Sequence, residues 1–487
     1  MMFRPRIGLE IHIRLLTSSK VFCPCPVRYG DEPNSLVCPV CLGYPGSLPV
    51  LNGEALRMAC LLAHALNCSI APDLRFDRKH YFYPDMPKNY QITQVSAPLG
   101  RDGSLELETG GGKTVSIRQL HLEEDAGKMI HRGNRTLLDY NRAGSPLVEI
   151  VTAPELETGE EAELLLRSLR RIVRYLGVCD GNMEEGSMRC DANVSMSPRG
   201  VEHSPGAEAP SGDPPGRKVE IKNLNSSRFV RLALDYETSR QREILRRGGR
   251  VAGETRLWNE AAGVTEAMRD KGESSDYRNV PETDLPPFPL DPEYLEGVKR
   301  QLVELPSPRK RRLVRDYGLS GDAADFLTEE KDVADFFERA AALGADPRTA
   351  ASWLRSEVRR ILNRENLSLG ESPLTEKRLV ELLGLVREGG IGGGIARKTL
   401  EEVFRTGRDP AEIVRERGWE PITRRDALLP VVEKILAAHP KAARELREGK
   451  DRALDFLTGM ALKETAGRAD PGLVKALISD VLKEGRG

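Results

Sequence analysis

Hydrophobic and polar residues alternate along the first part of the chain. From Ile7 to Leu15 every second residue is apolar, and this period of two is typical of a strand that buries one face. Similar alternation predicts further strands within 115–128, 139–155, 181–197 and 219–226. The sequence therefore predicts a sheet with one apolar face.

Apolar residues recur at helical spacing between these strands and dominate the second half of the chain. This spacing predicts helices over 52–66, 157–177 and 227–248. A proline-rich stretch ends at Pro292, and the pattern then stays helical into a tail that begins near Asp409. Because 487 residues exceed one ordinary core, we expect an α+β domain followed by helical domains.

Acidic side chains gather on the polar faces of these strands. Glu10 and His12 project from one face, because residues two apart in a strand point the same way. For that strand alone, a solvated polar face is the commoner explanation. Later strands add Glu123, Glu124, Asp191 and Glu220. Clustered carboxylates repel one another unless a cation compensates them, and oxygen-rich clusters suit Mg²⁺. The repetition therefore favours a charged working face.

Glu123 and Glu124 are consecutive. Adjacent residues of a strand point to opposite faces. The two acids can therefore share a site only if the strand ends or bulges there.

The cysteines fall into two groups. Cys23, Cys25, Cys38 and Cys41 form a C-x-C pair and a C-x-x-C pair. Four thiolates at such spacing can close a tetrahedral zinc site that has no open position. The alternative is four reduced thiols without a metal. The scattered cysteines are expected to be free thiols in a reducing compartment: Cys60, Cys68, Cys179 and Cys190.

Basic and aromatic residues interleave within 77–94. Lys79 is followed by Tyr81 and Tyr83, and such a combination can hold phosphate and stack a base. A surface loop with aromatic anchors explains these residues equally well. The basic run 309–312 could also meet nucleic acid, although a solvated helix face is the commoner explanation.

The composition is that of a well-solvated globular protein. Hydrophobic residues make up 39% of the chain and charged residues 30%, with a formal net charge of −1. No apolar run approaches the ~20 residues that span a bilayer, and the first residues lack the apolar core of a signal peptide. We therefore expect a cytoplasmic protein without a membrane partner. A polyanion would have to bind local basic patches.

Long motifs run through almost the whole chain. They include DRKHYFYPDMPKNYQITQ, HLEEDAGK, DYNRAGSPLVEIVT, GNMEEGSMRCDANVS and DYRNVPETDLPP. With IGLEIH and the four clustered cysteines, these motifs resemble the GatB/GatE family of tRNA-dependent amidotransferase subunits. Motifs of this length are too specific for a chance match.

The resemblance implies an α+β fold class with three domains. A mixed-sheet cradle domain with a zinc knuckle would cover 1–292. An all-α helical domain would follow over 293–408, and a small all-α tail domain that binds tRNA over 409–487. One departure from the family is the stretch from Arg199 to Arg217, which is longer than the family usually carries and is expected to form a surface loop.

The resemblance also implies a function. The chain would belong to a heterotrimer with an amidase and a second, small protein, and DNA is not an expected partner. It would use ATP to phosphorylate the side-chain carboxylate of mischarged Glu-tRNA(Gln) or Asp-tRNA(Asn), and ammonia from the amidase would then displace the phosphate. Phosphoryl transfer depends on positioning and charge neutralisation more than on a protein nucleophile, which fits the acidic strand faces.

Site residues follow from the same resemblance. The Mg²⁺ candidates are Glu10, His12, Glu123, Glu124, Asp191 and Glu220. The catalytic residues would be Glu10, His12, Lys79, Glu124 and Asp191. Lys79 is expected to contact a phosphate, and the group expected near the acceptor end of the tRNA is Lys79, Tyr81, Tyr83 and Arg142. The zinc ligands would be Cys23, Cys25, Cys38 and Cys41.

Two other functions fit parts of the sequence. A non-catalytic tRNA-binding scaffold would explain the basic helices but has no use for clustered acids. A free-standing small-molecule kinase would leave the helical second half unexplained.

Overall fold

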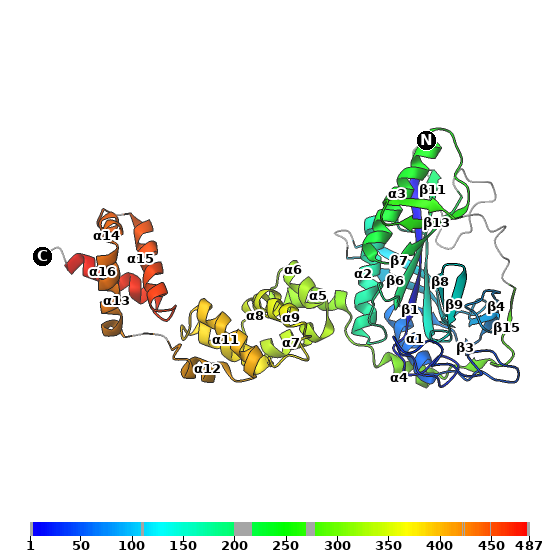
Figure 1. Ribbon diagram of the computed structural model, residues 1–487, viewed down its shortest axis with the longest axis horizontal. Coiled ribbons are helices and arrows are strands. Elements are labelled where there is room, and N and C mark those ends of the chain that lie inside the picture. The colour runs from blue at the N-terminus through cyan, green and yellow to red at the C-terminus, as the bar shows by residue number, and fades with distance from the viewer. Residues whose placement is uncertain are drawn as a thin grey trace. The chain divides into compact units, whose positions relative to one another are not determined.

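The computed structural model forms two compact units, Met1–Leu305 and Pro306–Gly487 (Figure 1). It describes residues 3–108, 112–198, 217–268, 278–420, 422, 424–448 and 450–484. The surface loop expected from Arg199 to Arg217 lies, except for Arg217 itself, outside the described residues.

The first unit is built on a mixed sheet of nine strands in the order β14-β13-β12-β11-β1-β10-β7-β6-β2. In that order the strands cover Val264–Ala267, Glu254–Asn259, Val219–Leu224, Met188–Pro198, Phe3–Arg14, Pro146–Thr152, Thr114–Glu124, Gly100–Glu106 and Ser69–Ile70. β12 and β13 are parallel, and the other neighbouring pairs are antiparallel. The predicted α+β class is confirmed.

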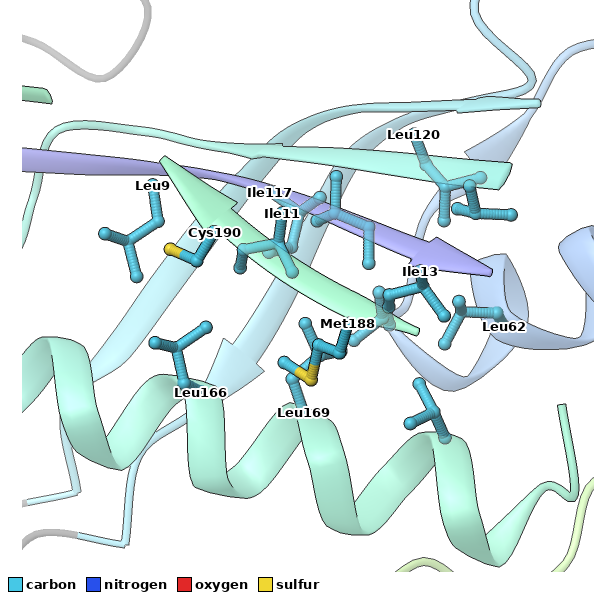
Figure 2. Close-up of a cluster of buried hydrophobic side chains, with 14 of the residues drawn as sticks. Leu9, Ile11, Ile13, Leu62, Ile117, Leu120, Leu166, Leu169, Met188 and Cys190 are labelled. Atoms are coloured by element: carbon cyan, nitrogen blue, oxygen red, sulfur yellow. The ribbon is translucent and has the colours of Figure 1, made fainter. Parts of the chain in front are cut away.

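One face of this sheet is apolar and covered by helices. Leu9, Ile11 and Ile13 of β1 are buried. They face Leu166 and Leu169 of helix α2, Gly159–Tyr175 (Figure 2). Helix α3, Ser227–Arg246, packs beside α2 and against β11, and helix α1, Gly53–Ala65, contacts β6 and β7. The alternate positions of β1 are left on the opposite, polar face.

Short strand pairs add to the nine-stranded sheet. β4, Asp77–His80, pairs with β5, Tyr90–Thr93, and with β15, Asn279–Pro281 (Figure 1). Two further pairs join β3 with β16, and β8 with β9, at Asp73–Leu74, Phe288–Pro289, Lys128–Arg132 and Arg135–Asp139. β4 is the strand that carries Lys79. Helix α4, Pro292–Lys299, completes the described elements of this unit.

The described elements of the second unit are helices. They cover Pro306–Tyr317, Gly321–Leu327, Lys331–Ala342, Pro347–Trp353, Leu354–Val358, Arg359–Glu365, Glu376–Arg387, Gly393–Thr406, Pro410–Glu416, Arg425–Ala438, Pro440–Arg447, Asp451–Glu464 and Pro471–Glu484. They are α5 to α16, with the π-helix η1 between α8 and α9. Their buried apolar residues form two clusters, one within 313–414 and one within 428–482. The domain boundaries at 292 and 408 stay a prediction.

The basic run at 309–312 is held by ion pairs inside the second unit. Arg309 contacts Asp335 at 2.7 Å and also Glu338, and Lys310 contacts Asp325 at 2.9 Å. These contacts support a structural role for Arg309 and Lys310. Within the part of the chain that the structure describes, no helix is long and apolar enough to span a membrane.

Candidate active site

The central strand β1 brings Glu10 and His12 to the polar face, and its two neighbours add to them. In the strand register Glu10 lies opposite Asp191 of β11, whereas His12 lies between Glu149 of β10 and Arg189 of β11. Residues directly opposite on neighbouring strands share a face of the sheet. The register therefore gathers three acids, an imidazole and a guanidinium.

These groups lie close enough to hold one ion. Glu10, His12 and Glu149 each offer a ligand atom, and the three atoms lie within 4.8 Å of one another. His12 Nε2 also lies 3.5 Å from Glu123 Oε1 and 3.7 Å from Glu149 Oε2. A histidine nitrogen among carboxylate oxygens is a ligand set for a divalent cation.

Burial makes the negative charge in this cluster unfavourable. It raises the pKa of Glu149 to about 9, with further contributions from the nearby Glu123 and Glu10 carboxylates. It raises the pKa of Glu123 to about 7 and also raises the pKa values of Glu10 and Asp191. A bound cation would reverse this effect, because an opposite charge favours the ionised carboxylate.

His12 is suited to ligation in its neutral form. Burial lowers its pKa to about 4, and the neighbouring Arg189 guanidinium contributes to this lowering. A neutral imidazole keeps a lone pair for a metal. The carboxylate of Glu10 and the imidazole of His12, which the sequence predicts on one face of β1, can therefore bind the same cation.

A cavity of about 420 Å³ opens beside the cluster. Its lining combines acids with cations, among them Lys79, Arg189 and Lys222. Lys222 Nζ lies 3.1 Å from Asp191 Oδ2 and 3.2 Å from Glu220 Oε1. Burial opposes its charge, but both acids outweigh that effect and raise the pKa of Lys222. Glu220 thus reaches the site through Lys222 and lies outside the group of three ligand atoms.

Arg189 is fixed on one side and unsatisfied on the other. Its Nη2 donates a 2.8 Å hydrogen bond to Asp125 Oδ2. Its Nε is buried without a hydrogen-bond partner. Burial would raise the pKa of Asp125, but Arg189 and Arg142 outweigh it and lower that pKa. The guanidinium therefore stays charged, and it lines the cavity while its buried Nε has no partner.

Glu124 points away from the cluster of ligand atoms. Its carboxylate forms a buried ion pair with Lys88 and accepts a 2.8 Å hydrogen bond from the Ile92 backbone. Glu123 instead accepts a bond from Thr93 Oγ1 at 3.0 Å and approaches His12. β7 ends at Glu124 without bringing the two acids to one face. The catalytic and Mg²⁺ roles of Glu124 stay predictions.

The residues expected near the tRNA acceptor end separate into two groups. Tyr81 lines the cavity with Lys79 and stacks on Tyr83, with ring centroids 5.3 Å apart. Arg142 does not line the cavity but lies behind it, because it donates to the backbone oxygens of Ala126 at 2.9 Å and Gly127 at 2.7 Å. The geometry supports Tyr81 more directly than Arg142.

The four clustered cysteines converge. Their sulfur atoms lie within 4.8 Å of one another, and Cys41 Sγ is 4.0 Å from Cys38 Sγ. Tetrahedral zinc with Zn–S bonds of about 2.3 Å needs sulfur atoms roughly 3.8 Å apart. The cluster can therefore hold a metal. The scattered Cys60, Cys68, Cys179 and Cys190 are all buried and free, as the sequence predicts.

Sequence patterns alone assigned no site role to Glu149, Arg189 or Lys222. Glu149 alternates with buried Val148 and Ile150, and Arg189 lies between buried Met188 and Cys190. The period-two pattern that identified Glu10 was thus present around both residues. It could not show that these strands flank β1.

The chain thus joins an α+β unit, which holds a cavity lined by carboxylates and cations, to a helical unit. Two family patterns match these parts. One is described as the GatB/GatE catalytic domain and matches residues 5–296, and the other is described as the GatB domain and matches residues 335–482. The chain therefore belongs to the GatB/GatE family, as its motifs predicted.

Full-length relatives carry one common name. The chain is 47% identical to the B subunit of the aspartyl/glutamyl-tRNA(Asn/Gln) amidotransferase of Carboxydothermus hydrogenoformans, over 98% of both chains. It is 45% identical to the protein of that name in Moorella thermoacetica, over 98% of this chain and 99% of the relative. In Thermodesulfovibrio yellowstonii the identity is 44%, over 99% and 100% of the two chains.

Proposed function

We propose that this chain is the tRNA-binding component of a tRNA-dependent amidotransferase and carries the site that activates the substrate with ATP. The names of its relatives support the amidotransferase reaction. The observation that carries the activation step is the ligand group of Glu10, His12 and Glu149, because His12 also lines a cavity that holds the cations Lys79 and Arg189. Phosphoryl transfer needs this pairing of a metal site with fixed positive charge.

The proposed chemistry explains why ATP is needed. A carboxylate resists attack by ammonia because it is negatively charged and has no good leaving group. Transfer of the γ-phosphoryl group of ATP to one carboxylate oxygen gives an acyl phosphate and ADP. Ammonia then attacks the acyl carbon, inorganic phosphate leaves, and loss of a proton gives the amide of Gln-tRNA(Gln) or Asn-tRNA(Asn).

Each side of the cavity has a part in this proposal. Glu10, His12 and Glu149 would hold Mg²⁺, which supplies charge neutralisation to the phosphates when bound. Lys79 would contact a phosphate oxygen, and the Arg189 guanidinium, which lines the same cavity, would donate to another. Both cations would stabilise charge that spreads over the transferred group.

The cysteine cluster would hold a structural zinc ion. The sulfur separations fit four thiolate ligands. Four protein ligands leave no open position, so this ion would stabilise the fold without contacting substrate. Metal analysis of protein purified without chelator should find about one zinc per chain. A content far below that would remove the zinc assignment.

The proposal includes three partners: an amidase, a small third protein of the heterotrimer, and a tRNA. An acyl phosphate reacts with water, so ammonia should arrive by a sheltered path from the amidase. The helical and tail domains would bind tRNA(Gln), tRNA(Asn) or both.

The test uses the complex reconstituted with the amidase and the small third protein. Glu149→Gln keeps the side-chain shape but removes a charge from the metal site. We expect it to lower both ADP formation and Gln-tRNA formation on the order of 100-fold. The exposed Glu160 of helix α2 offers a matched control, and Glu160→Gln should behave like the unmodified complex.

The outcomes distinguish a subunit that activates the substrate with ATP from a non-catalytic tRNA-binding scaffold. Full activity of Glu149→Gln would overturn the site assignment. ATP-independent amidation that needs this chain only to bind tRNA would identify the scaffold instead.

A further inference from the structure

Lys20 is a fully buried lysine beside the cysteine cluster. Its exposed fraction is 0%. Its Nζ lies 3.5 Å from Cys41 Sγ and 3.3 Å from the backbone oxygen of Tyr140. A buried ammonium group is costly unless an anion or several strong acceptors compensate it. An anion or several strong acceptors are therefore expected close to Lys20 Nζ.

The carboxylate that lies beside the nearby turn at Gly144 belongs to Glu124, which forms its ion pair with Lys88. Among the described residues, Lys20 forms no ion pair with an aspartate or glutamate within 4.0 Å. A neutral thiol and one backbone carbonyl give weak compensation. Four thiolates around a zinc ion carry a net charge of about −2, and Cys41 is the sulfur that faces the ammonium group.

We propose that Lys20 is the counter-cation of the metal-bound thiolates and that it couples occupancy of the cysteine site to the active site. The proposal rests on the zinc assignment above and goes beyond it. Whether the cysteine cluster holds zinc would then affect the geometry of the cavity.

The backbone around Lys20 shows how such coupling would run. Its own N–H donates to Cys25 O at 2.9 Å, and the next residue, Val21, donates to Gly144 O at 2.9 Å. Gly144 has a φ of +82°, and a Cβ there would lie 3.4 Å from Lys20 Cδ and 3.5 Å from Cys41 Cβ. The positive φ favours glycine at this position, and the distances show that the turn packs against the lysine and the cysteine.

The same turn holds a residue of the cavity. Gly144 N donates to Asp125 O at 2.9 Å, and Asp125 N donates to Ser145 O at 2.8 Å. Asp125 in turn fixes Arg189 at 2.8 Å. Loss of the thiolates would leave the Lys20 charge uncompensated, and any shift of Lys20 would pass through this turn to Arg189.

The knuckle touches the active-site strands at a second point. A Cβ at Gly43, in the turn after Cys41, would lie 2.6 Å from Lys88 Cγ. Lys88 forms the buried ion pair with Glu124 at the end of β7. Two buried lysines thus connect the cysteine cluster with the strands that carry the proposed site.

The first test measures zinc retention in the full chain. Lys20→Met removes the charge and keeps most of the side-chain volume. Competition with a chromogenic chelator should show zinc affinity lowered on the order of 10- to 100-fold, as for other changes around metal ligands. Lys113→Met is the control, because Lys113 forms an ion pair with Glu161 beside the opposite end of β7. It should retain zinc like the unmodified protein, and equal retention in both variants would overturn the proposal.

The second test asks whether the lysine acts through the thiolate. In the unmodified background Lys20→Met should lower Tm. In a Cys41→Ala background, which lacks the facing thiolate, the same change should leave Tm unchanged or raise it, because it removes an uncompensated buried charge. A residue that only fills space would lower Tm in both backgrounds, and that result would contradict the proposal.

The two proposals can fail separately. If the unmodified chain binds no zinc, the zinc assignment falls and the counter-cation role falls with it. If that chain binds zinc and Lys20→Met retains it equally, only the role of Lys20 falls. If Lys20→Met alone gives no folded protein, the pair of variants in the Cys41→Ala background still decides between compensation and space filling.

Discussion

At the scale of single residues, the cavity depends on a carboxylate that is not expected to touch substrate. Asp125 holds Arg189 at 2.8 Å and approaches Arg142 at 3.4 Å. Arg189 lines the cavity, so the position of its guanidinium there depends on how Asp125 holds it. The orientation of this guanidinium, and not its charge alone, is therefore the property that Asp125 would control.

Asp125→Asn tests this positioning role. The amide keeps the shape but pairs poorly with two guanidinium groups, so Arg189 should lose its fixed orientation. We expect kcat of the reconstituted amidotransferase to fall on the order of tenfold or more, since small misplacements of a catalytic group are costly. KM for the aminoacyl-tRNA should change less. Asp102→Asn, at an exposed position of β6, is the control and should leave both constants unchanged.

The residue scale also shows the limit of the sequence patterns. Alternation in β1 placed Glu10 and His12 on one face, and the structure confirms that placement. Alternation could not predict that Glu149 joins the site, because the pairing of β1 with β10 is what places Glu149 opposite His12. It also could not decide between Glu123 and Glu124, since the end of β7 and the ion pair with Lys88 depend on tertiary contacts.

At the scale of elements, the long strands and helices follow from sequence, whereas the short strands do not. Helix α2 begins after Thr158, whose side chain accepts from Glu161 N, and its apolar spacing was visible in advance. β15, at Asn279–Pro281, has three residues and exists only because β4 lies beside it. This pairing joins segments that are far apart in the sequence, so no periodic pattern of apolar residues predicts it.

Ion pairs of Arg78 with Glu282 and Asp284 add to the backbone pairing that holds the β15 segment on β4, the strand of Lys79. Glu282 has a fully buried side chain and binds Arg78 through both oxygens, at 2.7 and 2.9 Å. Glu282→Gln breaks this bidentate pair and leaves Arg78 with only its contact to Asp284 at 2.8 Å. The free energy of unfolding should fall by about 3 kcal/mol.

Because Lys79 follows Arg78 on β4, KM for ATP should rise in the same Glu282→Gln variant. Denaturant unfolding and ATPase kinetics check the two effects. The control is Glu266→Gln at the exposed end of β14, where neither quantity should change. A stable variant with unchanged KM would show that the β15 segment does not position Lys79.

Arg309 of helix α5 forms ion pairs with Asp335 and Glu338 of helix α7, and their contribution to stability should depend on pH. Burial would raise the pKa values of Asp335 and Glu338, but Lys331, Arg309 and Arg312 outweigh it and lower both. Carboxyls with lowered folded-state pKa values contribute stability above their unfolded pKa values, and this contribution is lost as the pH falls through the folded values.

Arg309→Met should therefore lower the free energy of unfolding by about 3 kcal/mol at pH 7. The difference from the unmodified protein should shrink as the pH falls below about 4, where the acids become protonated. Thermal unfolding between pH 7 and pH 3 measures the difference. Arg311→Met, at an exposed position of the same helix, serves as the control. A difference that stays constant with pH would assign the effect to packing.

At the scale of the whole molecule, the two apolar clusters of the second unit determine where the chain can be divided. Ile413 and Val414 of helix α12 belong to the first cluster, and Trp419 packs against it. The second cluster begins with Leu428, with Ile422 packed against it. A chain that ends at Glu420 would therefore keep the first cluster complete and remove the second as a unit.

This truncation tests how the proposed activities are distributed. The cavity and the cysteine cluster lie in the first unit, so ATP hydrolysis by the reconstituted complex should stay within about twofold of the full-length value, or roughly 0.4 kcal/mol. If the tail binds tRNA, the affinity for tRNA should fall on the order of tenfold, about 1.4 kcal/mol. Fluorescence anisotropy with labelled tRNA measures the second quantity. Equal losses of ATP hydrolysis and tRNA affinity would mean that the tail acts as a structural support, because a binding domain can be removed without disabling a separately folded catalytic unit.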